Sequence, residues 1–197
     1  MQPAPPTSIP AAILAGGKAT RYGGVPKGLL ELPGGATIIE RLLRVISKAG
    51  ITEILICAND ATSYAHLGHE IIADAVPDAG PLGGIAAALR HFAGRADGVL
   101  ILPCDMPAIT EREVGALVQA FGKSDARLVV AAAHDMQPLC AVLRPSLLDE
   151  VLRAIESGEL SVGRLWRQVG AELVRFPDPH PFANVNAPAD LAALTDV

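Results

Sequence analysis

Residues 12–28 place an apolar run, paired glycines and three cations next to one another in the chain. The apolar run, residues 9–15, stops at Gly16, which predicts a buried strand leading into a loop. Glycine lets the backbone turn sharply and lets a ligand approach the main chain. The loop carries three basic residues, which are Lys18, Arg21 and Lys27. Because such cations bind phosphate through charge-assisted hydrogen bonds, the loop is predicted to hold a polyanion, with a turn of solvated charges as the alternative.

Short β-rich runs alternate with longer helical patterns along the chain. The predicted strands are residues 11–14, 53–58, 70–73, 98–102, 127–133, 139–143 and 172–176. The predicted helices are residues 37–49, 61–67, 81–92, 111–121, 145–156, 162–169 and 188–194. This alternation favours one domain, residues 9–197, with a doubly wound and mainly parallel α/β sheet. Residues 134–143 and 171–176 are expected to add an antiparallel strand and a small lid-like region, and residues 1–8 a disordered tail.

Composition argues against several classes of protein. A net charge of −5 without a long basic run does not suit a nucleic-acid-binding face. No apolar run approaches the roughly 20 residues that span a bilayer, and the first residues lack the basic region of a signal peptide. The cysteines are Cys57, Cys104 and Cys140, which lack metal-finger spacing. Reduced, mostly buried thiols and a cytoplasmic protein are therefore expected.

Two aspartates are predicted to lie where strands end. Asp105 follows an apolar run within a proline-bracketed loop, so its carboxylate suits Mg²⁺, although a turn or N-cap role fits its position equally well. Asp74 ends a short strand, where a turn residue is the simpler interpretation. The glycines that follow it, Gly80, Gly83 and Gly84, predict either a tight turn into a helix whose N-terminus faces the site or a close packing contact.

Four segments, in this order, resemble the molybdenum cofactor guanylyltransferase family, and the resemblance runs from about residue 9 to residue 194. They are Leu14-Ala-Gly-Gly17 with Arg21 and Gly23-Gly-x-x-Lys-Gly28, then Gly80-Pro-Leu-Gly-Gly84, Pro103-Cys-Asp-Met-Pro107 and Asn184-Val-Asn-Ala-Pro188. The resemblance implies an enzyme that transfers GMP from GTP to molybdopterin and uses Mg²⁺. It also implies partner proteins that insert the cofactor and molybdoenzymes that receive it.

The resemblance assigns roles to individual positions. The implied nucleotide-binding residues are Leu14, Ala15, Gly16, Gly17, Lys27, Asn59, Asp74 and Asp105. The implied catalytic residues are Asp105, Lys27 and Arg21, with Asp105 as the metal ligand. The implied acceptor-side residues are Asn184 and Asn186.

The chain departs from the family pattern at two places. Cys57 matches the position of an asparagine in the nucleotide site, so either Asn59 takes over that contact or the contact is lost. Met136 and Gln137 stand where a basic residue is usual before Pro138, so recognition of the pterin is expected to differ. Two other functions stay open at this point: a CTP-dependent transferase of the same fold, and a non-catalytic protein that binds nucleotide or cofactor.

Overall fold

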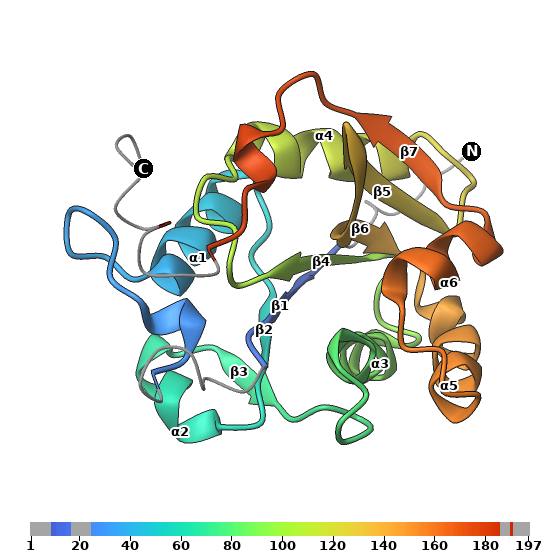
Figure 1. Cartoon of the computed structure of the whole chain (residues 1–197), viewed down its shortest axis with the longest axis horizontal. Coiled ribbons are helices and arrows are strands. Elements are labelled where there is room, and N and C mark those ends of the chain that lie inside the picture. Colours follow the sequence, from blue (N-terminus) through green and yellow to red (C-terminus); the bar gives the residue numbers. More distant parts are fainter. Residues whose placement is uncertain (1–8, 17–24, 186–189, 191–197) are drawn as a thin grey trace, which may run out of the picture.

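The computed structural model describes residues 9–16, 25–185 and 190 of the chain. Within these residues, seven strands form one sheet in the order β3-β2-β1-β4-β6-β5-β7. Their bounds are β1 (Ala11–Leu14), β2 (Ile54–Cys57), β3 (Glu70–Ile72), β4 (Val99–Pro103), β5 (Leu128–Ala133), β6 (Asp135–Leu143) and β7 (Glu172–Arg175). Helices lie on both faces of this sheet (Figure 1). The predicted doubly wound α/β fold is therefore confirmed.

The helices divide between the two faces. Their bounds are α1 (Ile38–Lys48), α2 (Ala61–Tyr64), α3 (Pro81–Phe92), α4 (Glu111–Gly122), α5 (Leu148–Glu156) and α6 (Val162–Val169). Short 3-10 helices are η1 (Lys27–Leu29), η2 (Ala65–Leu67), η3 (Pro145–Leu147) and η4 (His180–Phe182). Helices α1 and α4 pack on one face, and α3, α5 and α6 pack on the other (Figure 1). Buried side chains of β1 alternate between these two cores, as expected for a strand covered on both faces.

Polar side chains fix where two of the helices begin. Thr37 precedes α1, and its hydroxyl accepts from the Glu40 N–H while the Glu40 carboxylate accepts from the Thr37 N–H. Thr110 and Glu113 make the corresponding capping box at α4, as the sequence predicts. Each box satisfies backbone N–H groups that the first helical turn leaves unpaired.

Strand β6 is the antiparallel strand, pairing with β4 on one side and β5 on the other. It begins at Asp135, four residues before the predicted start at Leu139. The predicted strand is shorter than the observed one because proline lacks an N–H donor and normally interrupts a strand. Here the register with β5 shifts between the pairs Val130–Ala141 and Ala131–Gln137, so Pro138 falls in a bulge that does not need its N–H.

The second segment of the predicted lid-like region, residues 171–176, contains a strand of the main sheet. Strand β7 pairs with β5 in parallel and extends the sheet at its edge. The predicted helix 188–194 and the predicted tail lie outside the described residues. The three cysteines are free and buried, as expected. No helix within the described ranges is long and apolar enough to cross a bilayer.

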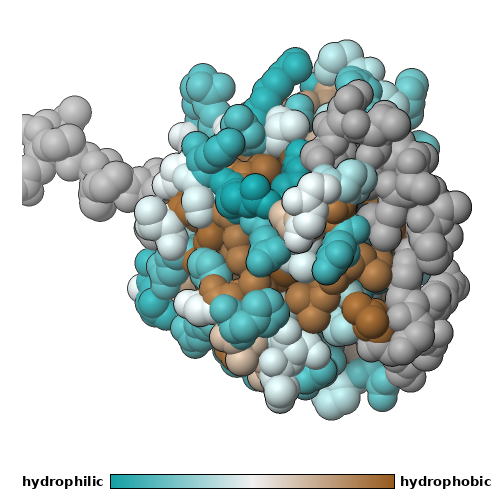
Figure 2. Space-filling model, turned by 90° about the vertical axis from the view of Figure 1, so that its left-hand side faces the viewer, coloured by the Kyte–Doolittle hydropathy of each residue, from teal (hydrophilic) through white to brown (hydrophobic). Residues whose placement is uncertain are grey.

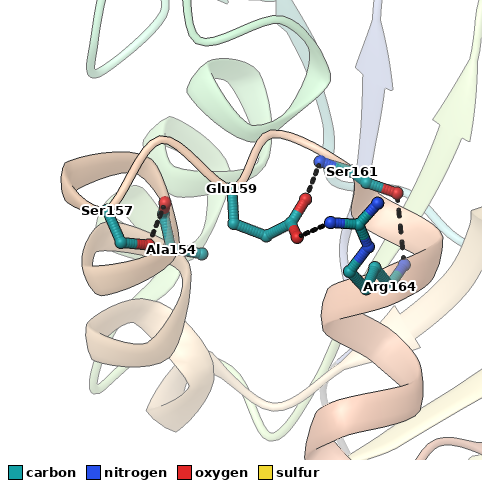
Figure 3. Close-up of polar contacts among 5 residues, drawn as sticks. All are labelled: Ala154, Ser157, Glu159, Ser161 and Arg164. Carbon is teal, nitrogen blue, oxygen red and sulfur yellow. Dashed lines mark hydrogen bonds and ion pairs between the residues drawn. The ribbon is translucent and has the colours of Figure 1, made fainter.

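The junction between α5 and α6 is fixed by one carboxylate (Figure 3). Glu159 accepts from the Ser161 N–H at 3.0 Å and from the Arg164 guanidinium. Ser161 in turn caps α6 by accepting from the Arg164 N–H. Helix α6 then holds the β6 bulge, because the buried indole of Trp166 donates to the Pro138 carbonyl at 2.7 Å. The bulge therefore rests on a helix whose start is itself held in place.

Candidate functional site

A cavity of about 810 Å³ lies at the carboxyl ends of β1, β2 and β4. Open α/β sheets bind ligands at this edge. Figure 2 views the molecule from this side and shows brown apolar surface between teal hydrophilic side chains. Seven of the residues predicted for the nucleotide line this one cavity: Leu14, Ala15, Gly16, Lys27, Asn59, Asp74 and Asp105.

Lys27 and Asp105 form an ion pair across the cavity. The Lys27 ammonium lies 3.3 Å from Asp105 Oδ2, and the two side chains are 29% and 20% exposed. The pair joins the glycine-rich loop to the loop after β4, although the two residues lie far apart in the sequence. A cation and a carboxylate that meet in a partly buried cavity can bind the phosphates and the metal of a nucleotide, respectively.

The loop around Asp105 is held by its backbone. Cys104 N–H donates to the Leu14 carbonyl at 3.1 Å, which ties this loop to the end of β1. Val185 N–H donates to the Asp105 carbonyl at 2.8 Å, and the Val185 side chain is buried. The segment that contains Asn184 is therefore fixed beside Asp105, although Asn184 itself does not line the cavity formed by the described residues.

Asn59 and Asp74 form a second polar pair at the same edge. The Asn59 amide donates to Asp74 Oδ2 at 2.8 Å, and its carbonyl accepts from the Asp74 N–H at 3.0 Å. Both hydrogen bonds join the loop after β2 to the loop after β3. Asn59, the predicted substitute for Cys57, therefore contacts Asp74, another of the predicted nucleotide-binding residues.

Two of the three glycines before and within α3 serve close packing. Gly80 is the N-cap of α3 with φ +58°, so it makes the tight turn that one interpretation predicted. A Cβ on Gly83 would lie 2.7 Å from the Val76 carbonyl oxygen, and one on Gly84 would lie 3.0 Å from the Leu14 side chain and 3.3 Å from Asp74 Oδ1. Gly83 and Gly84 thus let the first turn of α3 approach the Asp74 carboxylate.

The two cysteines that line the cavity have raised thiol pKa values. Burial raises the pKa of the Cys57 thiol to about 12, and the nearby Asp74 carboxylate adds to the effect. Burial also raises the pKa of the Cys104 thiol to about 12, with a contribution from Asp105. Both sulfurs are therefore protonated at neutral pH, and neither is an activated nucleophile.

Three further residues that the sequence pattern does not predict line the cavity: Tyr64, Asp60 and Leu139. Tyr64 is buried behind the cavity, where its hydroxyl donates to the Ala15 carbonyl at 3.4 Å, and burial raises its pKa. Asp60 caps α2, and hydrogen bonds from Ser63 lower the pKa of its carboxyl. Leu139 reaches the cavity from the β6 bulge. A β-bulge commonly redirects a side chain beside a site, and its position could not be predicted from the pattern of the strand.

Three predicted site residues, Gly17, Arg21 and Asn186, lie outside the described residues. Among the residues that the structure does describe, no cluster of three or more His, Cys, Asp or Glu side chains could hold a metal ion. A single carboxylate such as Asp105 still suits Mg²⁺, which keeps several waters and takes further oxygens from substrate phosphates.

The sequence matches known proteins over nearly its whole length. Residues 11–173 match the family described as the MobA-like NTP transferase domain. Molybdenum cofactor guanylyltransferase from Shewanella sp. (strain MR-4) is 38% identical over 184 residues, which is 91% of each chain. The protein of the same name from Burkholderia vietnamiensis (strain G4 / LMG 22486) is 38% identical over 199 residues, which is 95% of each chain.

The fold also matches a solved structure. Molybdopterin-guanine dinucleotide biosynthesis protein A from Archaeoglobus fulgidus superposes with a TM-score of 0.76 and is 25% identical. The match covers 93% of this chain and 95% of that one. The sheet, its helices and the cavity edge therefore belong to a known architecture.

Proposed function

Because the chain belongs to the MobA-like NTP transferase family and is a nucleotidyltransferase, we propose that it transfers GMP from GTP to molybdopterin. The products would be the guanine dinucleotide form of the cofactor and pyrophosphate. The shared name of the relatives at 38% identity supports this choice of substrates. The observation that carries the chemistry is the Lys27–Asp105 contact inside the cavity at the carboxyl edge.

The nucleotide would occupy the cavity between β1, β2 and β4. The main chain at Leu14, Ala15, Gly16 and Gly17 would contact the base and ribose. Asp74 would accept hydrogen bonds from the base, with Asn59 beside it. Lys27 and Arg21 would bind the phosphates.

In the reaction, a phosphate oxygen of the acceptor attacks the α-phosphorus of GTP. A new P–O bond forms as the bond from the α-phosphorus to the bridging oxygen breaks, and pyrophosphate leaves with that electron pair. Lys27 and Arg21 stabilise negative charge on the phosphates. The chain otherwise contributes positioning and electrostatics, which are the main demands of phosphoryl transfer. No protein nucleophile takes part, in keeping with the protonated thiols at the cavity.

We propose Mg²⁺ as the cofactor, with Asp105 as its protein ligand. The residues present fit this ion, since a carboxylate oxygen beside substrate phosphates is its usual protein ligand and Asp105 lines the cavity. When bound, the ion would supply positive charge to the triphosphate.

The acceptor would approach beside Asp105, on the side of Asn184 and Asn186. Support comes from the hydrogen bond that holds Val185 against Asp105. We further propose a cytoplasmic enzyme that hands its product to cofactor-inserting proteins or molybdoenzymes. The reduced state of its buried cysteines fits such a compartment.

The deciding experiment is a turnover assay with a molybdopterin source, Mg²⁺ and GTP, CTP or ATP in turn. A site built around guanine's N–H groups leaves its own acceptors unpaired when cytosine enters, so discrimination on the order of 10⁴ is expected. Equal or faster turnover with CTP would assign the chain to the cytidylyl branch. Nucleotide binding without turnover would make it a binding protein.

A further inference from the structure

The carboxylate of Asp74 accepts one hydrogen bond from Asn59 and lies close to two glycines, Gly84 and Gly16. The Asn59 amide donates to Asp74 Oδ2 at 2.8 Å, and the Asn59 side-chain carbonyl accepts from the backbone N–H of Asp74 at 3.0 Å. Gly84, in the first turn of α3, lies so close that a Cβ there would be 3.3 Å from Oδ1. Gly16, at the end of β1, faces both oxygens, since its Cβ would lie 3.7 Å and 3.8 Å from them.

We infer that Asn59 is a positioning residue that sets base selectivity by fixing the orientation of the Asp74 carboxylate. This inference rests on the proposed function, because it takes Asp74 to be the acceptor for guanine. It also gives Asn59 a different role from direct nucleotide binding. Its amide nitrogen and its carbonyl oxygen each already contact Asp74, so its main effect on the ligand passes through that residue.

The count of hydrogen-bond acceptors supports this division of roles. An ionised carboxylate has about four lone-pair sites, two on each oxygen. The Asn59 amide occupies one site on Oδ2, which leaves acceptors on both oxygens for a ligand. Guanine presents two adjacent donors, the ring N1–H and the N2 amino group. A carboxylate held in one plane can accept from both at once, whereas a rotating one must first be ordered at an entropic cost.

Orientation and stability can be separated here because the pair is exposed. Exposed hydrogen bonds and charges contribute little to folding. Removal of the Asn59 amide should therefore alter how the carboxylate meets a base much more than it alters the melting temperature. A residue that only supported the fold would change the binding of all nucleotides alike.

The test measures dissociation constants for GTP, inosine triphosphate and CTP in Mg²⁺, together with melting temperature. Inosine triphosphate keeps the N1–H but lacks the N2 amino group. The wild-type enzyme should prefer GTP by about tenfold or more, the value of one hydrogen bond to a charged group. Asn59→Ala removes both contacts and should reduce this preference to about threefold or less. Asn59→Asp keeps an acceptor for the Asp74 N–H but loses the amide donor, and it should lose the preference too.

Ser124→Ala is the matched control. Ser124 also makes an exposed hydrogen bond to a carboxylate, donating to Glu172 Oε2 at 2.6 Å, but away from the cavity lining. This variant should keep the wild-type preference. If Asn59→Ala keeps the wild-type ratio of GTP to inosine triphosphate affinity, or weakens both equally, the positioning role is wrong. If the wild-type enzyme itself does not prefer GTP over CTP, the proposed function fails instead.

Discussion

The nucleotide half and the hairpin half of this sheet are built in different ways. The nucleotide half consists of β1, β2 and β3, which are short parallel strands whose loops bring Asn59 and Asp74 to one edge. The hairpin half consists of β5, β6 and β7, where β6 runs antiparallel and carries a bulge at Pro138. Between them lies β4, whose end supplies Asp105.

The difference shows how one edge can hold two kinds of contact. Parallel strands end at the same edge, so polar residues just past their ends converge without long loops. An antiparallel strand begins at that edge instead, so β6 presents the start of a strand there, with Leu139 in the cavity. The nucleotide half thus contributes the polar pair Asn59 and Asp74 to the cavity, whereas the hairpin half contributes one apolar side chain, Leu139.

Asp105 lies between the two halves, and its substitution should have the largest effect on turnover. Asp105→Asn is nearly isosteric and should fold normally, but turnover should fall by about 10²-fold or more, because a charged ligand at the reacting phosphates is removed. GMP transfer in Mg²⁺ and the melting temperature measure the two effects. Near-normal turnover of the folded variant would refute the assignment.

The charged character of the nucleotide half is tested at Lys27. Lys27→Ala should weaken GTP binding by about tenfold, since one charge-assisted contact is lost. The melting temperature should hardly change, because the ion pair is partly exposed and screened. Calorimetric titration with GTP gives the affinity, and Lys123→Ala, an exposed lysine at the end of α4, is the control. An unchanged dissociation constant would put Lys27 outside the site.

The hairpin half is tested at Trp166, whose indole holds the β6 bulge. Trp166→Phe keeps most of the buried volume but removes the indole N–H that the Pro138 carbonyl accepts. The free energy of unfolding should fall by about 1–2 kcal/mol. The KM for the acceptor should rise several-fold, while the GTP dissociation constant stays at the wild-type value. An equal effect on GTP and acceptor would mean that the two halves do not act separately.

A further effect is one that both halves share. Burial raises the pKa of Cys57 and Cys104 from 9.0 to about 12 and also raises that of Cys140, so the folded protein holds protons that the unfolded chain releases above pH 9. Stability is therefore at its full value below about pH 9 and falls as the pH rises toward 12. Melting temperatures at pH 8 and pH 10 measure the decline. Rapid alkylation of the native protein at pH 8 would contradict it.

Strand and helix positions could be predicted because each is marked by local pattern. Apolar runs, capping residues and glycines at helix ends indicated nearly every element, and the end of the first strand pointed to Gly16 and Lys27. The start of β6 could not be predicted, because a proline usually marks the end of a strand and the bulge that accommodates Pro138 has no local sequence pattern. The Asn59–Asp74 contact was also out of reach, since nothing local indicates that two polar residues on neighbouring strands share hydrogen bonds.

The strand order has a consequence for synthesis of the chain on the ribosome. Strands β1 to β4 are complete neighbours once β4 has emerged, so the nucleotide half can pair as it is made. Strand β5 emerges next but has no place beside β4, because β6 occupies that position. It must wait for β6 to be inserted between them, and the Asp105 carbonyl must wait longer still for Val185. Vectorial synthesis thus brings the loops of Asn59, Asp74 and Asp105 to one edge before Val185 is available to bind the Asp105 carbonyl.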